Sequence, residues 1–318
     1  MAERTITVRP YVEGDLDGVL DLLRTALGET SLLRRTPELF AWKHQRNPFG
    51  PSILLVAECE ERIAGLRALM RWDLVTVSGE TLRCVRAVDT ATHPDFQRLG
   101  IFRTLTMAAI DQATADGIDM VFNTPNPKSG AGYLSMGWVH VGDIGVMATP
   151  GRGVLRGRAK EDAPPDPVDY VSNPAPAQDL DVVDRPARGL RTPRRSDYLS
   201  WRFGEHPTVR YLRVDAGAAT AVVRPNVRSG RRELVLSDVF GPSPARAVGA
   251  VIGRNRAAYL AGWFSAGSPE RRAMVRRGVL PVPRMKTLSL VARPLRSLPV
   301  DVASLAAWDI ASSDLELL

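Results

Sequence analysis

The chain has 318 residues, of which 44% are hydrophobic and 24% are charged, and its formal net charge at pH 7 is +7. This length gives room for two domains of ordinary size, and the composition is typical of a soluble globular protein. No apolar run approaches the roughly 20 residues that a helix needs to cross a bilayer, which excludes a helical membrane protein. The basic surplus suits anionic ligands, although a solvated basic surface explains it as well.

The N-terminal residues and the two cysteines predict a cytoplasmic protein. Residues 1–10 contain no apolar stretch long enough for a secretory signal. Cys59 and Cys84 lie in strand-like sequence, so we expect two buried thiols and no disulfide. No group of Cys and His residues has the spacing of a metal site, so we expect no metal.

The first half of the chain alternates between strand and helix patterns. Ile6 and Val8 share one face of a first strand, and Asp15 precedes an apolar-periodic helix as a candidate N-cap. Thr36 followed by Pro37 predicts the start of a second helix. Three strands are then expected, the last two joined by a hairpin turn, at residues 53–57, 63–75 and 82–92.

The turn after the third of these strands has features of a phosphate site. Pro94 ends the strand, and Gln97, Arg98 and Gly100 precede an amphipathic helix that begins near Ile101. The first amides of a helix have no acceptor within the helix, and the helix dipole is positive at that end. A basic, glycine-bearing turn before a helix can therefore hold a phosphate, but one glycine also fits an ordinary strand–helix junction.

A second motif follows this helix. Gly117 is expected to end the helix, and the apolar pattern predicts a short buried strand at residues 119–123. After the strand, five residues stand at fixed spacing, namely Asn126, Ser129, Tyr133, Gly137 and Trp138.

Together the two motifs resemble the acyl-CoA-binding core of the GNAT superfamily of N-acyltransferases. The segment 97–102 is similar to the family's Gln/Arg-x-x-Gly-x-Gly/Ala turn, and 126–138 is similar to its Asn-x-x-Ala-x-x-x-Tyr-x-x-x-Gly-Phe element. The resemblance implies acetyl-CoA or another acyl-CoA as co-substrate. The residues that it implies for cofactor binding are Ala91, Thr92, Gln97, Arg98, Leu99, Gly100, Ile101, Phe102 and Arg103.

One residue departs from the family pattern. Phe102 stands where the family usually has a small residue. We expect its backbone amide to face a phosphate still, and its ring to turn away into the core. A large residue at this position would change how the bound cofactor is oriented.

The resemblance also implies candidates for the chemistry. Tyr133 occupies the position that protonates the CoA thiolate in many family members, and a phenol is a reasonable donor to a thiolate with a pKa of about 8.5. Asn126 would orient a water molecule or the cofactor, although an Asn-Pro turn explains it too. Backbone amides near Ala91 and Thr92 would polarise the thioester carbonyl. Asp89, an acid in an apolar strand, could accept the proton of the amine or could bond a neighbouring loop.

The second half of the chain repeats details of the first. Trp42-Lys43 with Asn47-Pro48 has a twin in Trp201-Arg202 with His206-Pro207, at identical spacing. Gly137 of the Tyr133 element has a counterpart in Gly278. The segment after Gly241, where a cofactor loop would lie, instead contains prolines, which have no backbone N–H to donate. We therefore expect a second, degenerate GNAT-like unit that does not bind CoA.

We predict an α/β (α+β) fold of two tandem GNAT-like units, each a mixed, mostly antiparallel sheet flanked by helices, with a splayed strand pair in the first. The predicted divisions are an N-terminal GNAT domain that binds acyl-CoA (1–148), a Pro/Gly/Arg-rich linker with partial order (149–190), a C-terminal GNAT-like domain without a cofactor loop (191–293) and a tail (294–318).

The leading hypothesis is an N-acyltransferase that moves an acetyl or other short acyl group from acyl-CoA to an amine of a small molecule or peptide by direct attack. One alternative uses an aminoacyl-tRNA as donor on the same fold, and arginines at 185, 188, 191, 194 and 195 would suit its phosphates. Another is an acyl-CoA sensor without turnover. The amine, the acyl length and the oligomeric state do not follow from the sequence.

Overall fold

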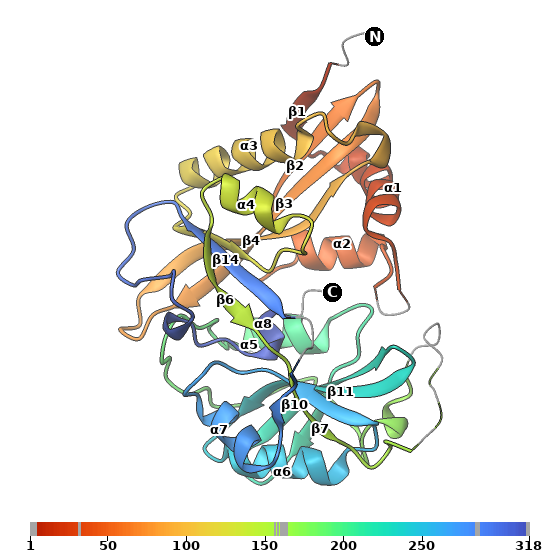
Figure 1. Cartoon of the computed structure of the whole chain (residues 1–318), viewed down its shortest axis with the longest axis vertical. Helices are drawn as coiled ribbons and strands as arrows, with labels where there is room; N and C mark the ends of the chain where they lie inside the picture. The colour runs from red at the N-terminus through yellow and green to blue at the C-terminus, as the bar shows by residue number, and fades with distance from the viewer. Residues whose placement is uncertain are drawn as a thin grey trace.

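Two seven-stranded sheets lie one above the other along the long axis of the molecule (Figure 1). The computed structural model describes residues 5–30, 33–155, 157, 159, 165–283 and 287–315. Parts of two expected segments lie outside the described residues, namely 156, 158 and 160–164 of the linker and 316–318 of the tail.

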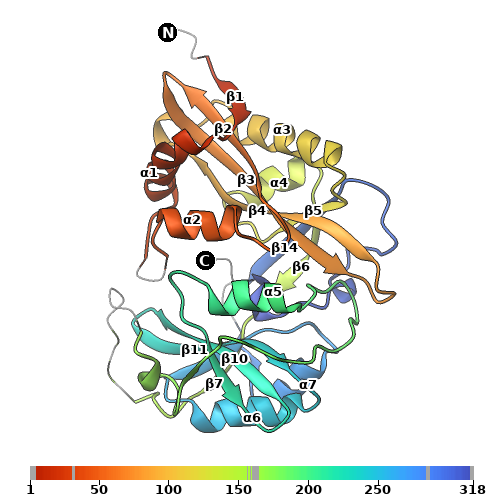
Figure 2. The same cartoon turned by 180° about the vertical axis from the view of Figure 1, so that it is seen from behind.

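The upper sheet contains strands β1 (Thr7–Pro10), β2 (Ile53–Cys59), β3 (Arg62–Val75), β4 (Thr81–Thr92), β5 (Met120–Asn123), β6 (Val139–Ile144) and β14 (Leu288–Pro294). Their order across the sheet is β1-β2-β3-β4-β5-β14-β6, and β4 and β5 run parallel. The helices around it are α1 (Leu16–Leu27), α2 (Pro37–His44), α3 (Ile101–Ala115) and α4 (Gly130–Ser135). Helices α3 and α4 cover one face of the sheet, and α1 and α2 lie on the other (Figures 1 and 2).

The lower sheet contains β7 (Met147–Pro150), β8 (Ala175–Pro176), β9 (Leu212–Asp215), β10 (Thr220–Arg228), β11 (Arg231–Phe240), β12 (Tyr259–Gly262) and β13 (Leu280–Pro281). Their order is β13-β7-β12-β11-β10-β9-β8, and β11 and β12 run parallel. The helices of this half are α5 (Ser196–Leu199), α6 (Pro244–Arg254), α7 (Pro269–Arg276) and α8 (Ser312–Leu315).

The two sheets have the same architecture. Strand for strand, β8 to β13 of the lower sheet correspond to β1 to β6 of the upper one, with the parallel pair in the same place. The predicted fold of two tandem units, each a mixed sheet flanked by helices, is therefore confirmed.

Each unit donates one strand to the other. Strand β14 comes after the lower sheet in the chain but pairs with β5 and β6 of the upper sheet. Strand β7 follows β6 but lies between β12 and β13 of the lower sheet. The donated strands occupy the same position in their sheets. The division at residues 148, 190 and 293 stays a prediction, and these two strands pair across it.

Local sequence signals explain several element boundaries. The Thr36 hydroxyl accepts a hydrogen bond from the amide of Leu39, so α2 begins as predicted. Gly79 has a φ of +86° in the turn between β3 and β4, and Gly117 has a φ of +69° just after α3. Residues that carry a Cβ atom rarely adopt a positive φ, which is why glycine stands at both positions.

The parallel strands diverge in both units. Strand β4 pairs with β5 only over residues 84–86, yet it continues to Thr92. Strand β11 pairs with β12 over residues 233–236 and continues to Phe240. The predicted splayed pair is thus present in the upper sheet, and the lower sheet has an equivalent.

The chain itself fills the lower splay. The Ser312 hydroxyl accepts a 2.7 Å hydrogen bond from the amide of Trp263, just beyond β12. The Ser313 hydroxyl donates a 2.8 Å hydrogen bond to Asp238, on the diverging end of β11. Helix α8 therefore bridges the two diverging strands, and no corresponding segment of the described chain bridges β4 and β5 in this way.

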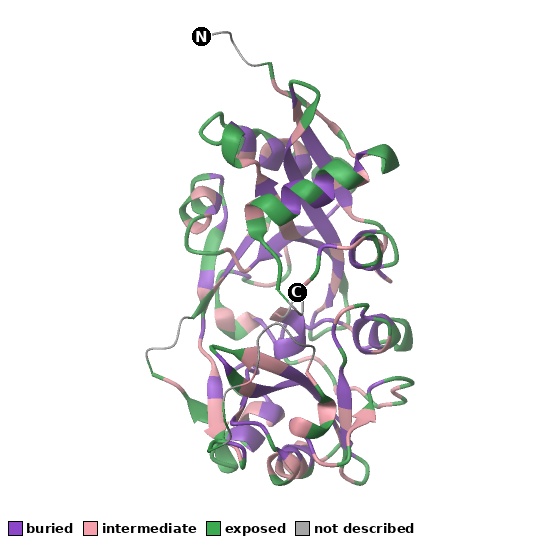
Figure 3. Ribbon diagram, turned by 90° about the vertical axis from the view of Figure 1, so that its right-hand side faces the viewer, coloured by how far each residue is buried: buried purple, intermediate pink, exposed green. Residues whose placement is uncertain are grey.

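Strands β2, β3 and β5 of the upper sheet are largely buried, and Figure 3 shows the burial along the ribbon. Cys59 and Cys84 are both buried and free, as predicted. None of the helices in the described parts of the chain is long and apolar enough to span a membrane. The expected cytoplasmic location stays a prediction.

Candidate active site

A cavity of about 470 Å³ lies beside the end of β4 and the start of α3, and we name it the outer cavity. Of the residues predicted to bind the cofactor, it is lined by Ala91, Thr92, Gln97, Arg98, Gly100, Ile101, Phe102 and Arg103. Leu99, the remaining one, is exposed and is not among the lining residues. The binding role of these residues stays a prediction.

The start of α3 presents unpaired backbone amides to this cavity. Gly100 is the N-cap residue, with a φ of +76°, and Arg98 has a φ of +64°. Within the described chain, the amides of residues 98–103 have no backbone acceptor, and the first turn of α3 contains no acid. Free amides at the positive end of a helix bind anions.

The charge of the outer cavity is positive. Arg98, Arg103 and Lys128 are among its lining residues, and none of these lining residues is an Asp or a Glu. A pyrophosphate group would therefore meet both backbone donors and cationic side chains.

A β-bulge prepares the end of β4 for a ligand. The register between β3 and β4 shifts so that Asp89 and Thr90 together lie opposite Arg67, and Asp89 has a φ of +44°. Beyond residue 86, β4 has no partner on β5. The edge from Val88 to Thr92 is thus free to pair with an extended ligand.

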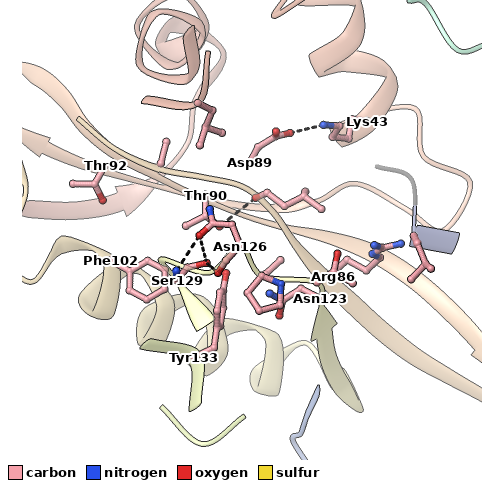
Figure 4. Close-up of a pocket in the computed structure, with 17 residues that line it drawn as sticks. Lys43, Arg86, Asp89, Thr90, Thr92, Phe102, Asn123, Asn126, Ser129 and Tyr133 are labelled. Carbon is pink, nitrogen blue, oxygen red and sulfur yellow. Dashed lines mark hydrogen bonds and ion pairs between the residues drawn. The ribbon is translucent and has the colours of Figure 1, made fainter. Parts of the chain in front are cut away.

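A second cavity of about 310 Å³, which we name the inner cavity, is shown with its lining residues in Figure 4. Seven residues line both cavities, namely Leu27, Thr90, Ala91, Thr92, Phe102, Asn126 and Ser129. The inner cavity extends to Tyr133 on α4, Asn123 at the end of β5, and Leu315 on α8. The splay of the upper sheet therefore opens into two connected spaces.

Tyr133 is buried at the wall of the inner cavity, and its hydroxyl oxygen accepts a 2.8 Å hydrogen bond from Arg67. Since a guanidinium only donates, the phenolic proton must point elsewhere. The ring of Tyr133 packs edge-on against Phe102 and Trp138. This packing fixes the hydroxyl beside the space into which a thioester would extend.

Arg67 was not recognised from the sequence. It is fully buried on β3, and its guanidinium also donates to the hydroxyls of Thr90 and Thr106. No ion pair of the described residues includes it, and it lies over the rings of Phe102 and Tyr133 at 5.2 and 5.3 Å. The available signal was that Arg67 is the one charged residue between Ile63 and Met70 of β3.

Phe102 lies differently from the expectation. Its ring is half-buried, and although it packs against the core it also lines both cavities, so it does not turn away from the ligand space. A Cβ atom at Gly132 would lie 2.9 Å from the ring. The missing side chain at Gly132 therefore makes room for a large residue at position 102.

Asn126 caps the loop before α4. Its Oδ1 accepts hydrogen bonds from the amides of Lys128 and Ser129 and from the Ser129 hydroxyl, at 3.0 to 3.1 Å. The turn-forming interpretation accounts for these contacts. Asn126 lines both cavities as well, so its contact with a ligand stays a prediction.

Asp89 lies in a cluster of cations. Its carboxylate accepts 2.8 Å hydrogen bonds from Arg35 and from Lys43, and His44 Nε2 lies 3.2 Å away. Burial opposes the charge of Asp89, but these partners outweigh it and hold the pKa of the carboxyl well below its usual value. Burial lowers the pKa of His44, which is therefore neutral at pH 7. A carboxylate so paired is a poor proton acceptor.

The lower unit contains the same ion pair. Arg35 stands seven residues before Trp42, and Arg194 stands seven before Trp201. Arg194 donates to Asp238 at 2.9 Å, as Arg35 does to Asp89 at 2.8 Å. The pair thus occurs in both units, including the one predicted to lack a cofactor loop, which favours a structural role for Asp89.

Two further polar groups at the inner cavity lack partners. Arg86 Nε and Asn123 Oδ1 are buried without a hydrogen bond to any described residue. Neither was recognised from the sequence, because the patterns of β4 and β5 marked only buried strands. The described residues also contain no group of three or more His, Cys, Asp or Glu side chains that could hold a metal ion.

Comparisons with known proteins agree with this geometry. Residues 7–141 match the sequence model of the acetyltransferase (GNAT) domain. A search of curated protein sequences finds no significant match.

Three solved structures of similar fold are GNAT proteins of low sequence identity. A GCN5-related N-acetyltransferase from Anabaena variabilis is 10% identical, with a TM-score of 0.60, and the match covers 92% of this chain and 73% of that one. One from Kribbella flavida is 14% identical, with a TM-score of 0.59 and coverage of 92% and 71%. A tandem GNAT protein from the clavulanic acid biosynthesis pathway is 12% identical, with a TM-score of 0.57 and coverage of 93% and 100%. Residues 7–141 therefore match the acetyltransferase (GNAT) domain, and the fold of the chain is that of two tandem GNAT units.

Proposed function

We propose that the upper unit transfers an acetyl or other short acyl group from acyl-CoA to an amine of a small molecule or peptide. The observation that carries this proposal is the set of free amides at the start of α3. They open on a basic cavity that continues to Tyr133.

The two cavities suit the parts of an acyl-CoA in order. The amides of residues 98–103 would hold the pyrophosphate, with Arg98 and Arg103 beside it. The pantetheine would pair with the free edge of β4 between Val88 and Thr92. This path would bring the thioester to the junction of the cavities, where Thr90 and Phe102 line both.

The inner cavity would then receive the amine. The neutral amine attacks the thioester carbonyl, whose oxygen is polarised by a β4 amide near Ala91 or Thr92. The C–N bond forms, the C–S bond breaks, and the departing thiolate takes the phenolic proton of Tyr133. Because Arg67 already donates a hydrogen bond to the Tyr133 oxygen, the phenolic proton is free to point at the sulfur.

Asp89 is not needed as the base. The α-amine of a peptide has a pKa of about 8, so deprotonating it at pH 7 costs only about 1 kcal/mol, and solvent can accept the proton. We assign Asp89 to holding Arg35 and Lys43 at the wall of the site, in agreement with the duplicated ion pair of the lower unit.

The lower unit would not bind acyl-CoA. Helix α8 bridges its diverging strands, and Pro242 and Pro244 stand at the start of α6, where they remove amide donors. Gly241 is also closely packed, since a Cβ atom there would lie 2.2 Å from the Ala218 carbonyl oxygen.

The aminoacyl-tRNA alternative loses its main support. Arg185 pairs with Glu270 and Asp309, and Arg191 pairs with Asp184. Arg191 also lies 4.0 Å from Asp309, Arg194 pairs with Asp238 and Asp314, and Arg195 pairs with Asp197. Arg188 is the member of the group without an ion pair to another described residue. Arginines already bonded to carboxylates are poorly placed to bind a phosphate backbone.

Calorimetric titration of the full chain tests the proposal. Acetyl-CoA should bind at one site per chain, and S-acetylpantetheine, which lacks the pyrophosphate and the nucleotide, should bind at least about tenfold more weakly. Thiol release from acetyl-CoA, measured with a panel of primary amines, then tests turnover. No binding of acetyl-CoA, or equal affinity for the two donors, contradicts the proposed site.

A further inference from the structure

Arg86 carries an uncommitted positive charge at the inner cavity. It is 2% exposed, and its guanidinium carbon lies 5.1 Å from the ring centroid of Trp72 and 5.2 Å from that of Phe122. Its Nη1 donates to the backbone carbonyl of Asp314, but no ion pair of the described residues includes its guanidinium. The Asp314 carboxylate accepts two 2.9 Å hydrogen bonds from Arg194 instead.

The free Nε–H of Arg86 is unusual because buried polar groups are nearly always hydrogen-bonded. Burial lowers the pKa of Arg86 to about 10, so the group remains charged at pH 7. A buried cation with an open donor is costly unless a ligand satisfies it. The chemistry that satisfies a guanidinium best is a carboxylate.

Asn123 supplies the complementary group. It is 3% exposed at the end of β5, and its Oδ1 has no donor among the described residues. In the view of Figure 4, Asn123 lies between Tyr133 and Arg86. The inner cavity therefore contains, in order, the predicted proton donor, an open acceptor and an open cationic donor.

The charges around the inner cavity also favour an anion. Lys43 and Arg86 line it, with Asp89 as the only acid among its lining residues, and Arg35 lies just behind Asp89. Since Asp89 bonds both Arg35 and Lys43, it cannot neutralise all three cations.

We propose that the acceptor is a primary amine that carries a carboxylate, as α-amino acids do, with the carboxylate bound by Arg86 and an amine N–H directed to Asn123 Oδ1. This inference rests on the proposed acyl transfer, for which it names the acceptor class. It places the amine on the Tyr133 side of the cavity and the carboxylate on the α8 side.

Matched acceptors test the inference in the full chain. Amino acids should be acetylated with KM values at least about tenfold lower than those of their amides and of the corresponding decarboxylated amines. Replacing Arg86 by Met, which keeps the apolar stem, should raise KM for the amino acids about 10- to 100-fold and leave KM for the decarboxylated amines unchanged. The variant Arg86→Lys should retain part of the preference.

Two controls keep the result interpretable. Arg71→Met removes an arginine of β3 that pairs with Asp116 away from the cavities, and it should leave the acceptor preference unchanged. Asn123→Leu tests the other half of the subsite. Since Asn123 Oδ1 has no hydrogen-bond partner among the described residues, the substitution removes no bond made by that oxygen, and it should raise KM for all amines. Calorimetry of each variant with acetyl-CoA verifies folding and donor binding.

The outcomes separate the two proposals. Turnover of amines with no preference for a carboxylate, or an equal loss for both acceptor types in Arg86→Met, overturns the inference and leaves the acyltransferase proposal intact. Absence of acetyl-CoA binding in the wild-type chain overturns both.

Discussion

Trp42 and Trp201 stack face to face, with ring centroids 4.4 Å apart, and each indole N–H donates a 2.9 Å hydrogen bond to the other's backbone carbonyl. The contact is reciprocal because the two residues are twins of the repeated sequence motif. A local twofold relationship therefore passes between the units, and the reciprocal donation of β7 and β14 agrees with it. The two units are joined by both core packing and strand pairing.

Replacing Trp201 by Phe should reduce the free energy of unfolding by about 2–4 kcal/mol, because the buried Trp42 carbonyl loses its donor and the smaller ring leaves a cavity. Chemical denaturation measures the loss. Trp138→Phe is a matched control, since the Trp138 indole nitrogen is buried without a partner in the described chain. A similar loss in both variants would show that the reciprocal bonds contribute nothing beyond ring volume.

His206, the counterpart of Asn47 in the second tryptophan motif, predicts that the stability of the chain depends on pH. His206 Nδ1 accepts a hydrogen bond from the amide of Thr208, two residues on, as Asn47 Oδ1 does from Phe49. Burial, together with nearby cations, holds the pKa of His206 well below its usual value. The unfolded chain therefore binds a proton below a pH of about 6.5 that the folded chain does not, and stability falls as the pH is lowered.

The variant His206→Asn should preserve the turn and remove this proton. Between pH 6.5 and 5, the stability of the wild type should fall more steeply than that of the variant, by up to about 1.4 kcal/mol per pH unit. His44 titrates in both proteins, so the difference isolates His206. Parallel curves over this range would mean that His206 is protonated in the folded chain.

The sequence predicted the fold and the repeated motif correctly because both depend on local patterns. The Thr36-Pro37 pair marks a helix start, and the two tryptophan motifs share the same spacing, so both signals can be read directly from the sequence. Strand donation was not predictable, because β7 and β14 are short apolar segments that fit either sheet, and the choice between sheets depends on tertiary pairing.

The candidate site was predicted in its loops but not in its interior. Gly100 and Tyr133 belong to motifs with distinctive spacing. Arg67, Arg86 and Asn123 stand in buried strands, where the sequence pattern does not say which face a residue occupies once a bulge shifts the register. Among the described residues, the two arginines lack a carboxylate partner and Asn123 Oδ1 lacks a donor, and both absences depend on the whole fold.

Replacing Gly100 by Val should weaken acetyl-CoA binding at least about tenfold, or 1.4 kcal/mol. A β-branched residue is strained at a φ of +76°, and its side chain would extend toward the predicted pyrophosphate position. Calorimetry on the folded variant measures the affinity. Gly79→Val imposes the same kind of strain at a φ of +86° in the remote β3–β4 turn and should leave affinity unchanged. If both variants lost affinity, the weaker binding of Gly100→Val would be due to a less stable fold and not to a blocked pyrophosphate position.

Replacing Tyr133 by Phe removes only the hydroxyl that Arg67 contacts. Acetyl-CoA affinity should stay nearly intact, because the ring contacts with Phe102 and Trp138 remain, while turnover should fall about 10²-fold or more. Single-turnover kinetics with the best acceptor amine measure the chemical step. The fall should shrink with a donor whose leaving thiol is more acidic, since that thiolate needs less help to depart.

A stability effect must be separated from this catalytic one. Without the Tyr133 oxygen, the buried Arg67 keeps its bonds to Thr90 and Thr106 but loses an acceptor, so a modest fall in melting temperature is expected. Thr106→Val removes another Arg67 acceptor without touching the phenol and serves as the matched control. It should show a comparable thermal shift with a far smaller change in turnover. If Tyr133→Phe instead turns over acetyl-CoA at the wild-type rate while chemistry is rate-limiting, Tyr133 is a packing residue and the proton comes from elsewhere.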